Sequence, residues 1–286
     1  MKDVVIDVAT AAGVWRLSDG GRTVEIEEHA VGWIVRQDGA TWAIVDEEEI
    51  WRSGPDGGWQ RVAISAGLPL RTLLPVADGL LVGSAEAHLY RCCHGPDLEP
   101  LMSFEFAPGR DDWFTPWGGP PDVRSMAIDD EGGIWRPTSL DIETDVHQVV
   151  TVGGHPDGVV AATGEGLARS EDAGATWTID REGLHATYCR AVAVLDDRVL
   201  VSASDGPQAD RAAVYRGRLD GSGLEKCSGG LPEWFSDNID TGCLAMRPGV
   251  AVFGTRDGRI YASDDDGESW ALVAEDLPRI HSLNLR

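Results

Sequence analysis

Lysine is almost absent from this sequence of 286 residues, in which Lys2 and Lys226 are the only two. The 24 basic residues face 48 acidic ones, so the formal net charge is −24 at pH 7. A field of this sign repels phosphate backbones, and we therefore expect no nucleic-acid partner. Such self-repulsion is best tolerated where salt screens it, so the composition favours a halophilic protein. A genome that prefers arginine would explain the missing lysines but not the surplus of carboxylates.

Cysteines and long apolar runs are also scarce. The cysteines form an odd and sparse set, which is typical of a reducing compartment: Cys92, Cys93, Cys189, Cys227 and Cys243. Cys92-Cys93-His94 has no second cluster at ligand spacing, so we expect no metal site there, and the sequence indicates no cofactor. No run is long enough to cross a bilayer, and the opening MKDVVIDVAT does not resemble a secretory signal. We expect a cytoplasmic monomer without a membrane partner.

Two patterns recur along the chain at intervals of roughly 40 residues. The first is an apolar–aromatic–arginine triplet with two degenerate copies: Val14-Trp15-Arg16, Ile50-Trp51-Arg52, Leu89-Tyr90-Arg91, Ile134-Trp135-Arg136, Leu167-Ala168-Arg169, Val214-Tyr215-Arg216 and Ile260-Tyr261-Ala262. The second is a short β-rich run marked by one large apolar residue: Ile34, Leu73, Met126, Val149, Val192, Leu244 and Leu283. Both patterns count seven copies.

The recurring runs are rich in Val, Ile, Trp and Tyr and alternate with Gly and Asp turns, which is typical of strands and hairpins. We therefore predict one all-β domain over residues 1–286, a seven-bladed β-propeller with four strands per blade. The second pattern marks each innermost strand and the first pattern marks each third strand. The final residues, RIHSLNLR, carry the innermost-strand pattern, so we expect the C-terminal strand to close the N-terminal blade.

The fourth copy of the repeat is short. Arg136 follows Arg124 by only 12 residues, whereas most copies leave 20 or more between the same two positions. We therefore expect a stunted fourth blade. A six-bladed ring that carries this piece as an insertion is the alternative.

One eight-residue phrase, Ser-x-Asp-x-Gly-x-Thr/Ser-Trp, occurs twice, as SEDAGATW at 170–177 and SDDDGESW at 263–270. Residues 17–24 (LSDGGRTV) and 53–59 (SGPDGGW) hold degraded copies. The phrase resembles the Asp-box of the bacterial neuraminidase repeat propellers, which include sialidases, sortilin-type receptors and photosystem II assembly factors. Each copy follows a third strand, so we expect a turn in which Asp accepts backbone N–H groups and Trp packs between blades. The resemblance implies that Asp172 and Asp265 lie opposite any active site and are not catalytic.

The first position of each innermost strand should lie at the mouth of the axial channel. The occupants are Gly32, Arg71, Arg124, His147, Arg190, Gly242 and His281. Five of them are cationic or become so on protonation, and arginine forks suit a carboxylate or phosphate. We expect an anion-binding mouth. The alternative is that these arginines pair with neighbouring carboxylates such as Asp122, Asp145 or Asp240 and tie the blades together.

Long connections on the same face should form the walls of this pocket. One contains Trp113 and Trp117, another contains Trp234, and a third places His185 before Arg190. We include Trp117, Trp234 and His185 among the ligand-binding candidates. A metal site built from His147, His185 and Asp145 is a third possibility that no ligand spacing supports.

An enzyme is the alternative function. Sialidases of the resembling family use three arginines, a Tyr nucleophile activated by Glu, and an Asp acid, but their Arg-Ile-Pro motif is absent from this sequence. Tyr90, Tyr215 and Tyr261 occupy the third-strand core position, which leaves only Tyr188 for chemistry. The catalytic candidates would be Tyr188 with Asp205, Asp237 or Glu182, acting as a glycosyl hydrolase on an acidic sugar. We expect instead a non-catalytic binding or assembly protein whose partner is a protein or a small anionic ligand.

Overall fold

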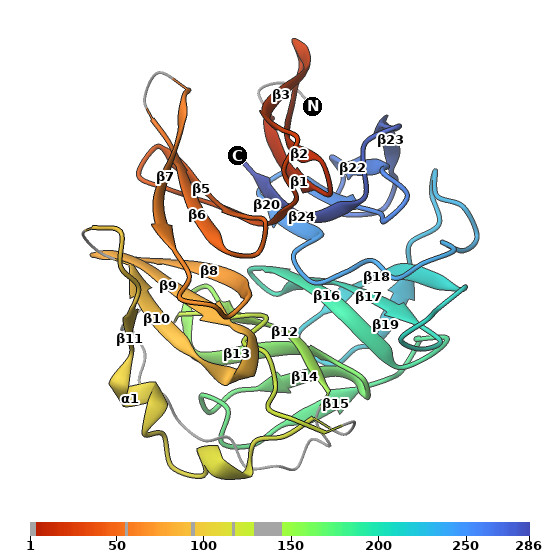
Figure 1. Cartoon of the computed structure of the whole chain (residues 1–286). Helices are drawn as coiled ribbons and strands as arrows, with labels where there is room; N and C mark the ends of the chain where they lie inside the picture. Colours follow the sequence, from red (N-terminus) through yellow and green to blue (C-terminus); the bar gives the residue numbers. More distant parts are fainter. Residues whose placement is uncertain (1–3, 55–56, 93–94, 116–117, 129–144) are drawn as a thin grey trace.

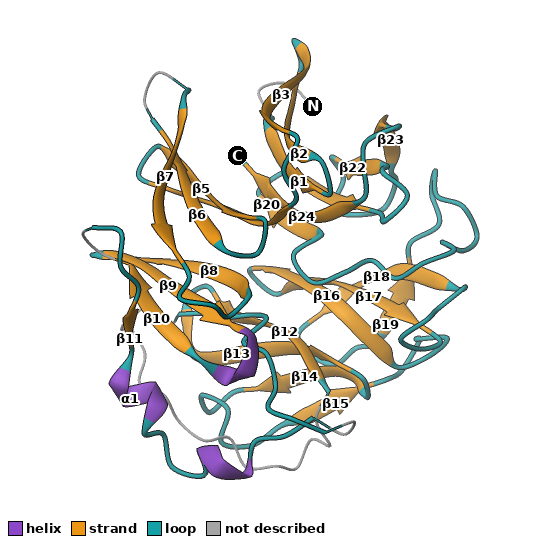
Figure 2. Ribbon diagram, viewed as in Figure 1, coloured by secondary structure: helices purple, strands orange, loops and turns teal. Residues whose placement is uncertain are grey.

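A computed structural model describes residues 4–54, 57–92, 95–115, 118–128 and 145–286. These residues form six four-stranded antiparallel sheets arranged as blades about a central axis (Figure 1). Figure 2 shows that nearly all of the regular structure is strand. The all-β propeller class is confirmed, and the expected count of seven blades is wrong.

Blades 1 to 3 each contain four strands, given in order from the innermost to the outermost. Blade 1 consists of β24 (Ile280–Leu285), β1 (Ile6–Thr10), β2 (Gly13–Ser18) and β3 (Gly21–Glu27). Blade 2 consists of β4 (Val31–Gln37), β5 (Ala40–Val45), β6 (Glu49–Ser53) and β7 (Trp59–Ile64). Blade 3 consists of β8 (Leu70–Val76), β9 (Gly79–Ser84), β10 (Leu89–Cys92) and β11 (Glu99–Pro100).

The other three blades have the same order. Blade 4 consists of β12 (Val146–Val152), β13 (His155–Thr163), β14 (Gly166–Ser170) and β15 (Thr178–Asp180). Blade 5 consists of β16 (Tyr188–Leu195), β17 (Arg198–Ser204), β18 (Ala212–Arg218) and β19 (Leu224–Lys226). Blade 6 consists of β20 (Leu244–Arg247), β21 (Val250–Gly254), β22 (Ile260–Ser263) and β23 (Ala271–Ala274). Three short helices complete the described elements: η1 (Ala85–Ala87), α1 (Met102–Glu105) and η2 (Arg110–Asp112). None of the described helices is long and apolar enough to span a membrane.

Six copies of each sequence pattern fall on the expected strands. The apolar markers other than Met126 lie in the innermost strands, and the triplets other than Ile134-Trp135-Arg136 lie in the third strands. Two of the three third-strand tyrosines are core residues, since Tyr215 and Tyr261 are 1% and 7% exposed, whereas Tyr90 is half-buried. The repeat therefore predicted strand order as well as strand position.

The fourth copy does not form a blade in the described part of the chain. Residues 122–128, which include Arg124 and Met126, run without strand structure between blades 3 and 4. Val123 N donates to the Ser84 carbonyl of β9, and Ser125 Oγ accepts from Val149 N of β12. Only 21 residues separate Arg124 from Val146, whereas four strands with their turns need about 30. The triplet at 134–136 lies outside the described residues.

The C-terminal strand closes the ring as expected. β24 pairs antiparallel with β1, and Leu283 faces Val8. The buried Asp7 carboxylate lies between two cations, accepting from Arg16 Nε at 2.8 Å and from Arg286 Nε at 2.6 Å. The first and last described strands are therefore joined by an ion pair as well as by backbone hydrogen bonds.

Both full copies of the eight-residue phrase form the expected turn between a third and a fourth strand. Asp172 Oδ1 accepts from Thr176 N and Ser170 Oγ, each at 2.8 Å, and Asp172 Oδ2 accepts from Thr176 Oγ1 at 2.7 Å. Asp265 makes the same set of bonds with Ser263 and Ser269. Trp270 is 5% exposed and packs edge-on against Phe253. These two aspartates have structural roles in their own turns.

The buried cysteines have thiols of low reactivity. Burial raises the pKa of the Cys189 thiol to about 12 and that of Cys227 to about 11, and it also raises the pKa of Cys243. Thiols with raised pKa values form little of the reactive thiolate. Cys93 and His94 lie outside the described residues. The described cysteines thus pack as small apolar side chains.

Candidate functional site

A cleft of 380 Å³ lies where the innermost strands β4, β8 and β16 begin. Its walls come from seven segments of the chain, and the lining residues are Trp33, Glu47, Arg71, Asp122, Arg124, Arg190, Asp240, Thr241 and Arg256. Four arginines and three carboxylates meet there, in a protein whose acids outnumber its bases two to one. Arg71, Arg124 and Arg190, expected at this mouth from their strand positions, line one cleft together.

Two of the four arginines each bind two carboxylates. Arg71 donates to Glu47 Oε1 at 2.7 Å and to Asp122 Oδ2 at 2.9 Å. Arg256 donates to both oxygens of Asp240 and, at 2.7 Å, to Asp237 Oδ1. Burial opposes the charge of Arg256, but the hydrogen bonds and charges of Asp240 and Asp237 together outweigh that effect, and the net result is a raised pKa. These two arginines and their acids tie the neighbouring loops together.

Arg124 and Arg190 interact with acids, Asp122 and Asp240, that already bind Arg71 and Arg256. Arg124 Nε lies 3.8 Å from Asp122 Oδ2, which is too long for a hydrogen bond, and 47% of its side chain is exposed. Arg190 Nη1 forms an ion pair with Asp240 Oδ1 at 2.8 Å, the same oxygen that accepts a hydrogen bond from Arg256. Arg190 Nε is buried and has no hydrogen-bond partner among the described residues. Arg124 and Arg190 therefore hold the surplus donors of the cleft.

His147, Asp145 and Tyr188 form a chain of polar contacts beside Arg190. His147 is 3% exposed; its Nε2 lies 3.1 Å from Asp145 Oδ2 and its Nδ1 lies 2.6 Å from the carbonyl oxygen of Cys189. Tyr188 also hydrogen-bonds to Asp145, and the Arg190 guanidinium lies 5.9 Å from the centroid of the Tyr188 ring. Burial, followed by the Asp145 charge, raises the pKa of the Tyr188 hydroxyl. Asp145 is thus the carboxylate in reach of Tyr188.

The remaining candidates lie outside the cleft. His281 Nδ1 faces the Val31 carbonyl oxygen at 3.0 Å, so this ring joins β24 to β4, and burial lowers its pKa. His185 contacts Trp234 at 4.5 Å between ring centroids and bonds to the Tyr215 hydroxyl at 2.7 Å. Lys226 Nζ lies 3.3 Å from the centroid of the Trp234 ring. His185 and Trp234 therefore form a separate aromatic cluster in blade 5.

The carboxylates named as partners of Tyr188 are placed elsewhere. Asp205 binds Arg211 at 3.1 Å and Asp237 binds Arg256. Glu182 lines another groove, beside Arg198 and Arg216. Trp117 lies outside the described residues, and Trp113 packs against Phe104 at 5.5 Å between centroids. In the described ranges no set of three His, Cys, Asp or Glu side chains is arranged to hold a metal ion.

Sequence reasoning missed Arg256 and Trp33 as lining residues. Arg256 follows β21 in the turn TRDGR, and turns that follow second strands open on the face where innermost strands begin. This position after a second strand could have identified Arg256 as a lining residue from the sequence. Trp33 lies two residues after the start of β4 and packs against Gly242, whose φ is +76°; a Cβ there would lie 2.9 Å from the indole. This approach depends on a contact between blades and could not be predicted.

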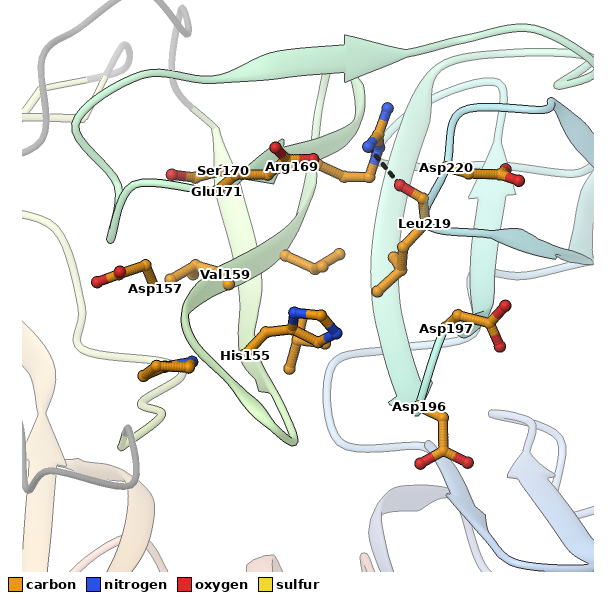
Figure 3. Close-up of a pocket in the computed structure, with 14 residues that line it drawn as sticks. His155, Asp157, Val159, Arg169, Ser170, Glu171, Asp196, Asp197, Leu219 and Asp220 are labelled. Atoms are coloured by element: carbon orange, nitrogen blue, oxygen red, sulfur yellow. Dashed lines mark hydrogen bonds between the residues drawn. The ribbon is translucent and has the colours of Figure 1, made fainter.

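A groove surrounded by acidic side chains lies at the opposite ends of the innermost strands. A cavity of 510 Å³ follows the ends of β12 and β16 and has an apolar floor that includes Val159 and Leu219. Five carboxylates surround it (Figure 3): Asp157, Glu171, Asp196, Asp197 and Asp220. The Arg169 guanidinium donates to the Leu219 carbonyl oxygen rather than reaching these acids. An anion therefore has favourable partners in the first cleft and unfavourable ones in this groove.

No protein-family model matches the chain, and no curated protein matches it in sequence. Several solved structures match the chain in fold. The WD40 propeller domain of Doa1 superposes with a TM-score of 0.67 at 14% identity, covering 99% of this chain and 90% of that one. Virginiamycin B lyase from Staphylococcus aureus gives 0.60 at 13% identity, covering 86% and 85%. An ancestral GH74 enzyme gives 0.61 at 12% identity, covering all of this chain and 40% of the enzyme. Likeness at this identity extends to the propeller fold alone.

Proposed function

We propose that the chain is a non-catalytic binding protein that holds an anionic group of its ligand between Arg124 and Arg190. The main support for this proposal is that Arg124 and Arg190 share their carboxylates, Asp122 and Asp240, with Arg71 and Arg256. Arg71 and Arg256 occupy the strongest positions on Asp122 and Asp240, so Arg124 and Arg190 keep unused donors. A ligand carboxylate or phosphate would accept from those donors, and charge-assisted bonds of this kind are among the strongest in proteins.

Arg71 and Arg256 have a supporting role in this proposal. Their bonds fix Asp122 and Asp240, which in turn limit where the guanidinium groups of Arg124 and Arg190 can lie. A preorganised pair of arginines loses less conformational entropy when the ligand binds than two mobile side chains would. The ring of Trp33 supplies an aromatic wall for the part of the ligand next to its anionic group.

The test is a thermal-shift panel of acetate, sulfate, phosphate, sugar acids and nucleotides, measured at high salt. We expect at least one of them to raise the melting temperature of the unaltered protein. Arg124→Ala and Arg190→Ala should each weaken binding about tenfold or more, because charge-assisted bonds contribute roughly 1.5–3 kcal/mol. Arg218→Ala is the control, since it removes the same charge from an exposed pair with Asp197. Equal losses in all three variants, or no shift with any compound, would overturn the proposal.

The alternative function, a glycosyl hydrolase for an acidic sugar, has one observation in its favour, the hydrogen bond between Tyr188 and Asp145. Burial and Asp145 raise the pKa of Tyr188, whereas a nucleophile needs its pKa lowered or a base that removes its proton. We therefore place binding first. Release of 4-nitrophenol from glycosides of sugar acids, abolished by Tyr188→Phe, would reverse this order.

A further inference from the structure

The outermost strand of blade 6, β23, has an unusual composition for an exposed sheet edge. Its sequence is Ala-Leu-Val-Ala, and it carries no charged residue. Each of the five other outermost strands carries at least one: β3, β7, β11, β15 and β19. Charged residues on an edge strand prevent its pairing with another chain. Among the described sheets, β23 is therefore the edge that composition protects least.

The side chains of β23 are also open to solvent, at the periphery of the propeller (Figure 1). Leu272 and Val273 are 45% and 40% exposed. β23 pairs with β22 on one side, and no described strand pairs with its other side. The backbone groups along that side have no backbone partner in the described part of the chain. The edge thus offers both apolar side chains and hydrogen-bonding backbone groups to a partner.

A groove of 500 Å³ runs beside β23, between blade 6 and the hairpin of β2 and β3 in blade 1. A bulge in the pairing of β22 with β23 leaves Val273 without a partner on β22. Leu272, Val273 and Ala274 all line the groove, together with Leu17 of β2. An extended segment laid along β23 would therefore cover apolar side chains while its backbone pairs with the strand.

Carboxylates lie at both ends of β23. Asp264 precedes it in the turn from β22, whereas Glu275 and Asp276 follow it and line the groove. All three are exposed, and none forms an ion pair with a described residue. Arg22 is the one cation among the described lining residues, and its guanidinium donates to the Glu275 carbonyl oxygen at 3.0 Å. A segment with basic residues at its ends and apolar residues between them would complement this edge.

We propose that β23 is a docking edge for an extended, basic segment of a partner protein, which adds a fifth strand to blade 6. Apolar side chains of this segment occupy the groove, and its basic ends pair with Asp264 at one end and with Glu275 and Asp276 at the other. The net charge of −24 favours a basic partner. It disfavours a second copy of this chain, which would bring the same carboxylates to the junction. The residues of this edge are not those of the arginine cleft, so the inference is independent of the proposed function.

The experiment uses a synthetic peptide of about eight residues, long enough to form one strand, in which valine and threonine alternate between pairs of lysines. Calorimetry with the unaltered protein should show binding, and hydrogen–deuterium exchange should show protection of the amides of β23. The same peptide with its central N–H groups methylated should bind about tenfold more weakly or worse, a change of roughly 1.4 kcal/mol, because it cannot donate to the edge. Equal affinity of the two peptides, or no binding of the unmodified one, would overturn the inference.

Two substitutions locate the peptide on the protein. Leu272→Lys places a cation on the docking edge and removes an apolar contact, so affinity for the peptide should fall about tenfold or more. Ile64→Lys is the matched control, because Ile64 is 48% exposed on β7, an outermost strand that already carries Arg61. Both variants add the same charge, so a general electrostatic effect would weaken binding equally in the two and would overturn the inference.

The remaining alternative occupant is a second copy of the chain. Analytical ultracentrifugation of the protein alone, over a series of salt concentrations that screen its charge, tests this directly. We expect a monomer throughout. A dimer that Leu272→Lys dissociates and Ile64→Lys does not would assign the edge to a second copy and would overturn the proposal of a basic partner.

Discussion

At the scale of the residue, Asp265 shows how one carboxylate stabilises its own turn. The Ser269 hydroxyl donates to Oδ2 at 2.6 Å, while Ser269 N and the Ser263 hydroxyl each donate to Oδ1 at 2.8 Å. These bonds favour the ionised form and lower the pKa of Asp265 to about 2. The side chain is exposed, so the effect comes from hydrogen bonding and not from burial.

This lowered pKa predicts a defined loss of stability in acid. The unfolded chain has an Asp pKa of roughly 3.9, so the contribution of Asp265 is fully present above that pH. It is lost as pH falls through about 2. Asp265→Asn should therefore lower the melting temperature at neutral pH, and its difference from the unaltered protein should shrink toward pH 2. Asp264→Asn, an exposed neighbour, is the control; if both variants behave alike, the turn does not depend on the carboxylate.

Single site residues were predictable in part. Arg71 and Arg190 could be placed at one mouth because the repeat fixes their position in the innermost strands β8 and β16, whereas Arg124 reaches the same cleft from a segment that forms no strand. His147 and His281 occupy equivalent positions, yet their rings bond to carbonyl oxygens of the next blade. A sequence pattern gives the start of a strand but not the direction of a side chain, which at these positions depends on the neighbouring strand.

At the scale of the element, closure depends on the contact between β1 and β24. Asp7 is fully buried and lies between Arg16 and Arg286, so one carboxylate is shared by two guanidinium groups at the junction, and Arg16 also pairs with Glu25. Arg286 also reaches the Thr41 hydroxyl of β5 at 3.2 Å. This cluster connects the C-terminal strand to blade 2 as well as to blade 1.

Removal of Asp7 should therefore be costly. Asp7→Ala removes the acid that Arg16 and Arg286 share, although Arg16 still pairs with Glu25, and breaking a buried pair in this way costs about 3–5 kcal/mol in the free energy of unfolding. Urea denaturation measures this loss. The matched control is Asp78→Ala, which breaks an exposed pair with Arg91 and should cost at most about 1 kcal/mol. Equal losses would contradict a special role for the junction.

The elements were predictable because the repeat appears twice, once in the innermost strands and once in the third strands. The blade count was not, because both patterns also occur near residues 124–136, where the spacing is too short for four strands. Residues 122–128 instead contact Ser84 and Val149 without strand structure of their own. Matching residues indicate a blade only when enough residues separate them.

At the scale of the whole molecule, the net charge of −24 is the dominant feature. Carboxylates surround the groove at the far ends of β12 and β16, whereas arginines gather where the innermost strands begin. The net charge therefore repels anions in general, while the arginines of the cleft offset it locally at the site where we propose that an anion binds. This polarity is a property of the fold as well as of composition, because the cleft arginines come from segments far apart in the sequence.

The same charge predicts a strong effect of salt on stability. Raising NaCl from about 0.1 M to about 1 M shortens the Debye length from roughly 10 Å to 3 Å and screens the repulsion between carboxylates. The melting temperature should rise over this range. A variant in which several exposed carboxylates of the far groove, such as Glu171 and Asp196, become amides should rise less. A melting temperature that falls with salt would contradict the halophilic interpretation.

The central claim is that Arg124 and Arg190 together bind an anion that no carboxylate of the protein replaces. The most direct measurement is a crystal structure of the protein soaked in sodium selenate, with the anomalous signal of selenium locating the anion. We predict a selenate ion bound to both guanidinium groups while Arg71 and Arg256 keep their bonds to Asp122 and Asp240. Arg124 and Arg190 bound only to those aspartates, with no anomalous peak in the cleft, would contradict the claim.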